Sequence, residues 1–199
     1  MVGIIDYGVG NLFSLQSSFK AIGEEAFVSG DVAELAKADR LLLPGVGAFE
    51  DAAKKLRASG LDSFVRQQVA AGKPLLGICL GMQMLFEKSF EYGEHEGLGL
   101  LKGQVVGMSG RLPQGLKIPQ MGWNALKLCK GAKLLQEGSF VYFVHSFYAE
   151  NCDDSLAAVT DYGIPITAAV EKDNIFGCQF HPEKSGNVGL EILKKFCEV

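Results

Sequence analysis

The sequence has no long hydrophobic run and no cluster of like charges. No apolar stretch reaches the ~18 residues of a membrane-spanning helix, and residues 1–6 show no basic segment of the kind that opens a secretory signal. With 19 Lys and Arg against 23 Asp and Glu, the net charge is −4, and neither sign forms a long run. These absences argue against a membrane protein, a secreted protein and a nucleic-acid-binding surface, and we expect a cytoplasmic address.

Cysteine is sparse and shows no pairing pattern. The five cysteines, at positions 79, 129, 152, 178 and 197, are an odd number at irregular spacings without the C-x-x-C spacing of a zinc site. A disulfide framework is therefore not expected, and most of the thiols should be reduced and buried. Cys178, His181 and Glu183 are conceivable metal ligands, but no second ligand cluster accompanies them and a strand points alternate side chains to opposite faces. We expect no metal and no cofactor.

The chain is rich in apolar residues, and these residues follow regular patterns along the sequence. Its 199 residues, 48% of them hydrophobic, suffice for one core, and we predict a single domain over residues 1–199. In the first half, short apolar runs alternate with segments of helical spacing, which predicts an α/β fold with an open, mostly parallel central sheet and flanking helices. From about residue 99 onward the second half should be rich in strands.

The expected elements follow from these patterns. Strands are predicted over residues 2–6, 40–43, 74–78, 105–106, 123–128, 140–148, 156–160, 166–170 and 175–180. Helices are predicted over residues 12–22, 49–56, 61–71, 82–87 and 187–197.

The segment Gly77-Ile78-Cys79-Leu80-Gly81 lies between a predicted buried strand and a predicted helix. This is the spacing of a nucleophile elbow, with cysteine in place of serine. Small residues on both sides let a strand turn sharply into a helix, which presents Cys79 at the carboxyl end of the sheet, where the helix N-terminus favours a thiolate. The same five residues would equally fit a buried cysteine between packing glycines.

A thiolate nucleophile needs a base, and the histidines are His95, His145 and His181. His181 is the best candidate because it directly follows the predicted strand 175–180, again at the carboxyl edge of a sheet. Glu183, two residues on across a stiffening proline, can accept one imidazole N–H and leave the other ring nitrogen facing Cys79. A lone histidine is more often a hydrogen-bonded packing residue, but the elbow and the H-P-E turn together favour a catalytic pair.

Acyl transfer through a thioester also requires hydrogen-bond donors for the oxyanion. In an elbow these are the N–H of the residue after the nucleophile, here Leu80, and an N–H from a loop after another strand. Pro44-Gly45-Val46-Gly47 follows the predicted strand 40–43 and suits the second role, because glycine lets peptide planes turn their N–H groups toward a ligand. A plain strand-to-helix turn would fit this segment equally well.

Three of these blocks together resemble one family. Residues 44–47 (P-G-V-G), 77–83 (G-I-C-L-G-M-Q) and 179–183 (Q-F-H-P-E) resemble, in order and spacing, the blocks of the class I, triad-type glutamine amidotransferases. The resemblance runs along the whole chain. Within that class, residues 6–11 (D-Y-G-V-G-N), 120–124 (Q-M-G-W-N) and 145–148 (H-S-F-Y) are similar to those of glutaminase subunits that serve a (β/α)8-barrel cyclase subunit in histidine biosynthesis.

The resemblance implies a mechanism and a set of site residues. Cys79 would attack the side-chain amide of glutamine, His181 would protonate the departing ammonia, Glu183 would orient His181, and water would release glutamate. Val46, Gly47 and the Leu80 N–H would serve the oxyanion, and Gly47, Gln83, Glu91 and Ser146 the substrate. The chain would form a heterodimer with the cyclase subunit through a face that includes Asn11, Trp123, Tyr142, His145 and Lys184.

The same resemblance implies regulation, because ammonia must not escape. Glutaminase activity would stay low until the cyclase holds its ribonucleotide substrate, and Val46 is where an oxyanion donor could turn in. The competing interpretations are a glutaminase of another synthase, such as a paralogue in a surface-sugar pathway, a cysteine peptidase or other thiol hydrolase, and a catalytically silent binding subunit. The blocks at 6–11 and 120–124 argue against anthranilate or pyridoxal phosphate synthesis, and the block at 179–183 argues against a peptidase.

Overall fold

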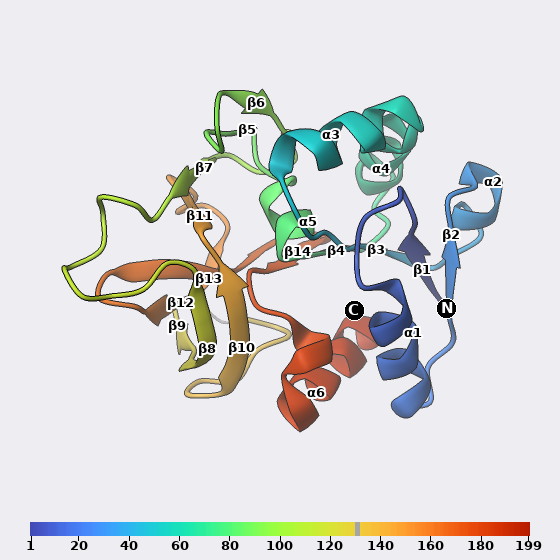
Figure 1. Ribbon diagram of the computed structural model, residues 1–199. Helices are drawn as coiled ribbons and strands as arrows, with labels where there is room; N and C mark the ends of the chain where they lie inside the picture. Colours follow the sequence, from blue (N-terminus) through green and yellow to red (C-terminus); the bar gives the residue numbers. More distant parts are fainter. Residues whose placement is uncertain (130–131) are drawn as a thin grey trace.

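The computed structural model describes residues 1–129 and 132–199 and is built around an eight-stranded sheet of order β2-β1-β3-β4-β14-β13-β12-β9 (Figure 1). Five neighbouring strands are parallel: β2 (Ala26–Ser29), β1 (Val2–Ile5), β3 (Arg40–Leu43), β4 (Leu75–Ile78) and β14 (Ile175–Cys178). The antiparallel continuation consists of β13 (Pro165–Lys172), β12 (Leu156–Asp161) and β9 (Lys127–Leu128). The predicted mostly parallel sheet is therefore confirmed.

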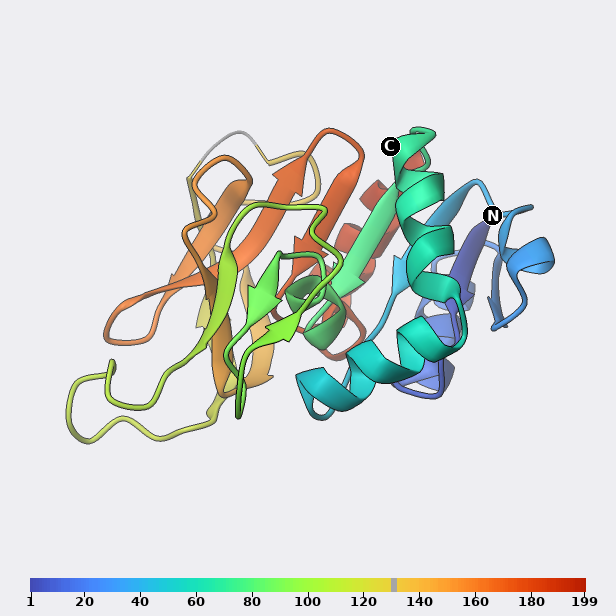
Figure 2. The ribbon, with the colours of Figure 1, turned by 90° about the horizontal axis from the view of Figure 1, so that it is seen from above.

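Helices cover both faces of the parallel strands (Figures 1 and 2). One apolar cluster joins α1 (Leu12–Ala21) and α6 (Gly186–Glu198) to the sheet, and the other joins α2 (Val32–Leu35), α3 (Phe49–Ala58) and α4 (Leu61–Ala70). Successive strand residues serve opposite clusters: Leu42 packs in the first, Leu41 and Leu43 in the second. Strands buried on both faces read as continuous apolar runs, which is why β1, β3 and β4 were predictable.

The second half adds two smaller sheets among the described residues. One is a ribbon of β8 (Gln120–Ala125) and β10 (Phe140–His145), and the other has the order β11-β7-β5-β6, with β5 (Lys88–Ser89), β6 (His95–Glu96), β7 (Gln104–Gly107) and β11 (Phe147–Glu150). The prediction of one strand over 140–148 is wrong, because the chain changes sheets at Ser146. The predicted strand 123–128 is likewise two strands, interrupted at the buried Leu126.

The helix predicted over residues 82–87 is also wrong. The structure has the single turn α5 (Leu80–Gln83), which begins immediately after Cys79. The carbonyl groups of Met84 and Leu85 accept hydrogen bonds from the N–H groups of residues 98, 100 and 101 instead of continuing the helix. No helix in the described part of the chain has both the length and the apolar character required to cross a bilayer.

Candidate active site

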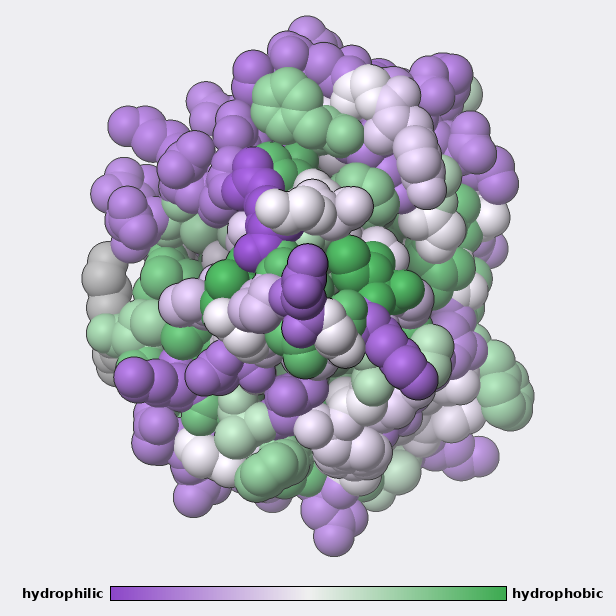
Figure 3. Space-filling model, turned by 60° about the vertical axis from the view of Figure 1, so that its left-hand side comes forward, coloured by the Kyte–Doolittle hydropathy of each residue, from purple (hydrophilic) through white to green (hydrophobic). Residues whose placement is uncertain are grey.

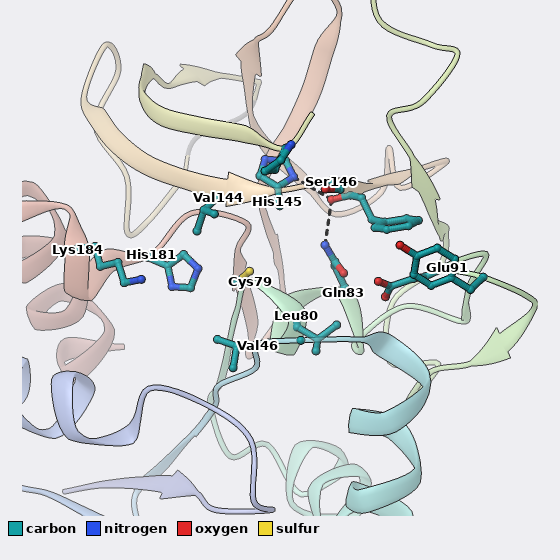
Figure 4. A pocket seen from close by; sticks show the side chains of 14 residues that line it. Val46, Cys79, Leu80, Gln83, Glu91, Val144, His145, Ser146, His181 and Lys184 are labelled. Atoms are coloured by element: carbon teal, nitrogen blue, oxygen red, sulfur yellow. Dashed lines mark hydrogen bonds between the residues drawn. The ribbon is translucent and has the colours of Figure 1, made fainter. Parts of the chain in front are cut away.

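A pocket of about 390 Å³ lies at the carboxyl ends of β3 and β4 and beside the turn that follows β14 (Figure 4). Parallel strands bring their carboxyl ends to one edge of a sheet, where loops can assemble a site. The residues predicted for the site that line this pocket are Val46, Gly47, Cys79, Leu80, Gln83, Glu91, His145, Ser146, His181 and Lys184. Glu183 lies behind His181, while Asn11, Trp123, Tyr142 and His95 are not among the lining residues.

Cys79 occupies a sharp turn between β4 and α5. Its backbone has φ 54° and ψ −112°, a sparsely populated conformation for a residue with a side chain, and its N–H donates to Cys178 O at 2.7 Å. A Cβ at Gly77 would lie 2.8 Å from Gly81 O, and one at Gly81 would lie 1.9 Å from Leu43 O. Both glycines are therefore required by close backbone approach, which supports the elbow over a cysteine packed between arbitrary small residues.

His181 faces Cys79 from the turn after β14 (Figure 4). Its Nδ1 lies 2.8 Å from Oε1 of Glu183, and both side chains are almost completely buried. Burial alone would lower the pKa of His181, but its interactions with Cys79 and with the Glu183 carboxylate outweigh burial and raise the pKa to about 9. Because Nδ1 is engaged by Glu183, Nε2 is the ring nitrogen left for the sulfur.

A short hydrogen-bonded network holds the His181 turn, which includes η1 (Pro182–Lys184), against β10. Ser185 Oγ donates to His181 O at 2.7 Å and accepts the N–H of Tyr142 at 3.0 Å. The N–H of His181 donates to Tyr142 O at 2.9 Å. The β8–β10 ribbon is thus attached directly to the turn that positions the histidine.

The loop after β3 lies against the elbow. A Cβ at Gly45 would lie 2.6 Å from Gly81 N, and Gly47 has φ +90°, so glycine is needed at both positions for different reasons. In the described part of the chain the N–H groups of Val46 and Gly47 donate to no other group, and Leu80, as the first residue of α5, has no intrahelical acceptor. These are the three backbone donors predicted for the oxyanion.

Tyr7 is a residue that sequence reasoning missed. Its buried hydroxyl donates to Pro44 O at 2.7 Å and so anchors the start of the loop after β3, and burial raises the pKa of the phenol. The signal was present in the sequence, since Tyr7 directly follows the predicted strand 2–6, at the edge of the sheet where the site was expected.

The other end of the pocket, opposite His181, holds Gln83 and Glu91 (Figure 4). Gln83 Nε2 donates to Phe147 O at 3.0 Å and to Gln179 Oε1 at 2.9 Å. Glu91 Oε2 accepts the N–H of Phe49 at 2.7 Å, and burial raises the pKa of this carboxyl. The Glu91 carboxylate therefore lies at the N-terminus of α3 while facing the pocket.

His145 lines the same pocket but is buried, only 6% exposed, beneath the surface where the partner was expected. Its Nδ1 lies 2.8 Å from Phe147 O, and since a carbonyl only accepts, Nδ1 carries the proton. Burial, with a contribution from nearby His181, lowers the pKa of His145 to about 4. The ring is therefore neutral at physiological pH.

Gln179 is the second residue to which sequence reasoning gave no role. It is the first residue after β14, it has no exposed surface, and its Nε2 lies 3.7 Å from Cys79 Sγ. A polar residue directly after a buried strand, in the same block as His181, was the available signal.

The β8–β10 ribbon exposes an apolar face beside the pocket. The cross-strand pairs Trp123 and Tyr142, Met121 and Val144, and Ala125 and Phe140 lie on it, and the rings of Trp123 and Tyr142 meet edge to face at 6.0 Å. Met121, Trp123 and Phe140 are each more than half exposed. Figure 3 shows hydrophobic residues gathered in the middle of the side that is turned forward from the left of Figure 1. Lys184 is exposed at the pocket rim, and Asn11 is half-buried at the start of α1.

The metal-ligand alternative finds no support in the geometry. Within residues 1–129 and 132–199, no three His, Cys, Asp or Glu side chains converge in a group that could hold a metal ion.

Comparisons with known proteins extend over nearly the whole chain. The model of the family described as "Glutamine amidotransferase class-I" matches residues 4–199. "Imidazole glycerol phosphate synthase subunit HisH" of Caldanaerobacter subterraneus subsp. tengcongensis is 52% identical over 203 residues, which cover 100% of this chain and 98% of that protein. The protein of the same description from Lactococcus lactis subsp. lactis is 50% identical over 199 residues, covering 98% and 96%.

A solved structure described as "Crystal structure of glutamine amidotransferase" superposes with a TM-score of 0.78 at 22% identity, covering 99% of this chain and 97% of that one. At this identity the likeness shows a shared fold.

Proposed function

The chain belongs to the class-I glutamine amidotransferases, and on this premise we propose that it is the glutaminase subunit of an imidazole glycerol phosphate synthase, acting in the cytoplasm. The family expected from the sequence is confirmed. The observation that carries the proposed activity is the arrangement of three side chains: His181 faces Cys79 across the pocket, and its Nδ1 lies 2.8 Å from Glu183 Oε1 (Figure 4). Over nearly its full length, this chain shares about half of its residues with proteins named as HisH subunits of this synthase.

In the proposed reaction the Cys79 thiolate attacks the side-chain amide carbon of glutamine and forms a carbon–sulfur bond. The His181 imidazolium gives its Nε2 proton to the amide nitrogen, the carbon–nitrogen bond breaks, and ammonia leaves a thioester on Cys79. Neutral His181 then takes a proton from water, whose oxygen attacks the thioester carbon. Breaking the carbon–sulfur bond releases glutamate and restores the thiolate and the imidazolium. The raised pKa of His181 suits this role, because the ring is charged before the leaving group departs.

The negative oxygen of each tetrahedral intermediate would accept hydrogen bonds from the N–H groups of Val46, Gly47 and Leu80. Gly47, Gln83, Glu91 and Ser146 would hold the amino-acid end of the substrate at the far end of the pocket. Oε2 of Glu91 is engaged by Phe49, which leaves Oε1 for the α-ammonium group of glutamine.

The apolar face of the β8–β10 ribbon is the proposed docking surface for the (β/α)8-barrel cyclase subunit, which would receive the ammonia and form imidazole glycerol phosphate and AICAR. Trp123 and Tyr142 supply aromatic area, and Asn11 and Lys184 would lie at the polar margin. His145 would lie beneath this face. Since Tyr142 is hydrogen-bonded to the His181 turn, docking on the ribbon can reach the catalytic pair.

The decisive experiment is glutamate release from glutamine by the purified chain, alone and with the cyclase subunit plus its ribonucleotide ligand. We expect strong stimulation by the liganded partner and loss of release in Cys79→Ala. The matched control is Cys129→Ala, which removes an exposed thiol that does not line the pocket. Undiminished release in Cys79→Ala would remove this cysteine as the nucleophile, and equal release with and without the liganded cyclase would refute the coupling.

The docking surface has its own test. Trp123→Ala should weaken binding to the cyclase subunit by about 10- to 100-fold, because a central aromatic residue often dominates an interface. Release of glutamate without the partner should not change. The matched control is Val32→Ala on α2, since Val32 is 43% exposed and α2 lies at the opposite end of the molecule from the ribbon (Figure 1). Calorimetric titration measures both, and similar affinities for the two variants would place the interface elsewhere.

A further inference from the structure

Gln179 approaches the reacting sulfur from the interior of the protein. Strands β4 and β14 are parallel and pair Ile78 with Cys178, so the next residues along, Cys79 and Gln179, leave the sheet side by side. Gln179 is fully buried and is not among the residues that line the pocket. Its Nε2 lies 3.7 Å from Cys79 Sγ, within hydrogen-bonding reach of a sulfur.

The orientation of this amide matters, because its oxygen and nitrogen have nearly the same shape and opposite effects on a thiolate. The neighbouring groups determine it. Phe147 O can only accept, so the Gln83 atom that faces it at 3.0 Å must be Nε2. The second N–H of the same Gln83 group meets Gln179 at 2.9 Å, so the Gln179 atom there must be Oε1. Nε2 of Gln179 is thereby directed at the sulfur.

The carbonyl at the start of this series is itself held in place. Phe147 O accepts a second hydrogen bond, from Nδ1 of His145 at 2.8 Å, and Phe147 belongs to β11. A fixed backbone carbonyl thus sets the orientation of two amides in succession.

We infer that Gln179 donates a hydrogen bond to the Cys79 sulfur and stabilises the thiolate from the side away from the substrate, with Gln83 as the residue that positions its amide. The inference rests on the proposed role of Cys79 as the nucleophile and deepens it. A hydrogen bond to an ionised acceptor is stronger than one to a neutral acceptor, and full burial removes competition from water. Gln179 then approaches the sulfur from the interior, while His181 faces Cys79 from the turn after β14 (Figure 4).

The test measures alkylation of Cys79 by iodoacetamide across a range of pH, quantified on the Cys79 peptide by mass spectrometry. Gln179→Leu removes the donor, and alkylation at neutral pH should fall about 10-fold or more, with the pH profile moved to higher pH. Gln179→Asn keeps an amide that is one methylene too short and should show the same direction of change. Gln104→Leu is the matched control, because Gln104 is a partly buried glutamine bonded to Glu150 and lies outside the pocket.

Gln83 provides the second half of the test. Gln83→Met releases the orientation of Gln179, so alkylation should fall by less than in Gln179→Leu. The double variant should alkylate at the rate of Gln179→Leu alone, since Gln83 acts on the sulfur only through Gln179. Thermal unfolding of each variant separates this effect from a general loss of structure.

Two outcomes would overturn the inference. One is wild-type alkylation of Cys79 at every pH in folded Gln179→Leu. The other is a double variant whose loss of alkylation equals the combined losses of Gln179→Leu and Gln83→Met. Alkylation needs neither glutamine nor the cyclase, so the two proposals fail separately. A chain that responds to Gln179→Leu but releases no glutamate with the liganded cyclase would refute the function and keep the inference.

Discussion

Two buried histidines on one pocket behave in opposite ways. His181 is 3% exposed and His145 is 6% exposed, yet the pKa of the first is raised to about 9 and that of the second is lowered to about 4. Each ring engages the residue two positions further along the chain through Nδ1 at 2.8 Å. The partner of His181 is the Glu183 carboxylate, whereas the partner of His145 is the backbone carbonyl of Phe147.

The comparison shows which force decides the charge of a buried imidazole. Burial lowers the pKa in both places, because it penalises the charged form. At His181 a carboxylate and a thiol overcome that penalty, while one neutral carbonyl at His145 does not. The pocket therefore combines an imidazolium that can donate a proton with a neutral imidazole that serves as a structural donor.

The largest expected effect is a difference in glutamine turnover between variants of the two histidines. With the liganded cyclase, His181→Asn should reduce the turnover of glutamine by roughly 10²- to 10⁴-fold, the usual contribution of a general acid and base. His145→Asn should reduce it by less than about tenfold, because the asparagine amide can still donate to Phe147 O. Steady-state glutamate release measures both. Equal losses would show that the charge difference has no bearing on the chemistry.

The second-largest effect on activity is expected when His181 loses its carboxylate partner and, like His145, has only a neutral partner at Nδ1. Glu183→Gln replaces the carboxylate with a neutral amide, so the pKa of His181 should fall and turnover should drop by on the order of 10²-fold. Activity that requires the imidazolium is lost as pH rises through this pKa, and the basic limb of the pH profile should therefore move to lower pH. Proton NMR of the ring in the same sample supplies the control, because the His145 titration should be unchanged.

The sequence predicted His181 and its environment far better than that of His145. The elbow and the H-P-E turn can each be recognised from a few neighbouring residues. Cys79 lies in one short block after an apolar strand, and His181 and Glu183 lie in another. The resemblance implied only that His145 lies near the partner face. Its burial depends on how β10 packs, which the alternation of residues 140–148 did not show. The break at Ser146 has the same origin, since β10 pairs with β8 while β11 pairs with β7.

Sequence reasoning also missed contacts that depend on which strands pair and in what register. Gln179 acts on Cys79 only because β4 and β14, about 100 positions apart, are neighbours in register. α5 ends after one turn because the backbone of residues 98–101 binds its following carbonyl groups, a contact that no periodicity reveals. The parallel strands, by contrast, were predictable because burial on both faces leaves a continuous apolar run.

The third effect concerns how the free energy of unfolding depends on pH. His145 should affect the acidic limb of this dependence, and His181 the basic limb. The folded pKa of His145 is about 4, below the ordinary value of about 6.5, so the unfolded chain takes up the proton first as pH falls. Stability should decrease from about pH 6.5 toward pH 4, by at most roughly 3 kcal/mol. The contribution of His181 is present below about pH 6.5 and is lost as pH rises toward 9.

Urea unfolding at several pH values measures both limbs. His145→Asn should flatten the acidic limb alone, and His181→Asn the basic limb alone. A flattened basic limb in His145→Asn would contradict the assignment of opposite signs.

The smallest effect comes from giving His145 a carboxylate, so that it resembles His181. Gln120 pairs with His145 across the β8–β10 ribbon and is fully buried, so its side chain projects on the same face as the ring. In the described part of the chain, Gln120 Oε1 and His145 Nε2 are buried and accept no hydrogen bond. Gln120→Glu should therefore raise the pKa of His145 by about one unit, because a nearby negative charge favours the imidazolium.

Ring titration by NMR measures this shift, and Gln104→Glu, a change of the same kind outside the pocket, should leave the His145 titration in place. A raised pKa in Gln120→Glu alone means that the partner group, and not the strand or turn that carries the ring, separates the two histidines. An unchanged pKa would mean that β10 keeps Nε2 out of reach of β8. The position of His145 within the fold, rather than the choice of its partner, would then keep it neutral.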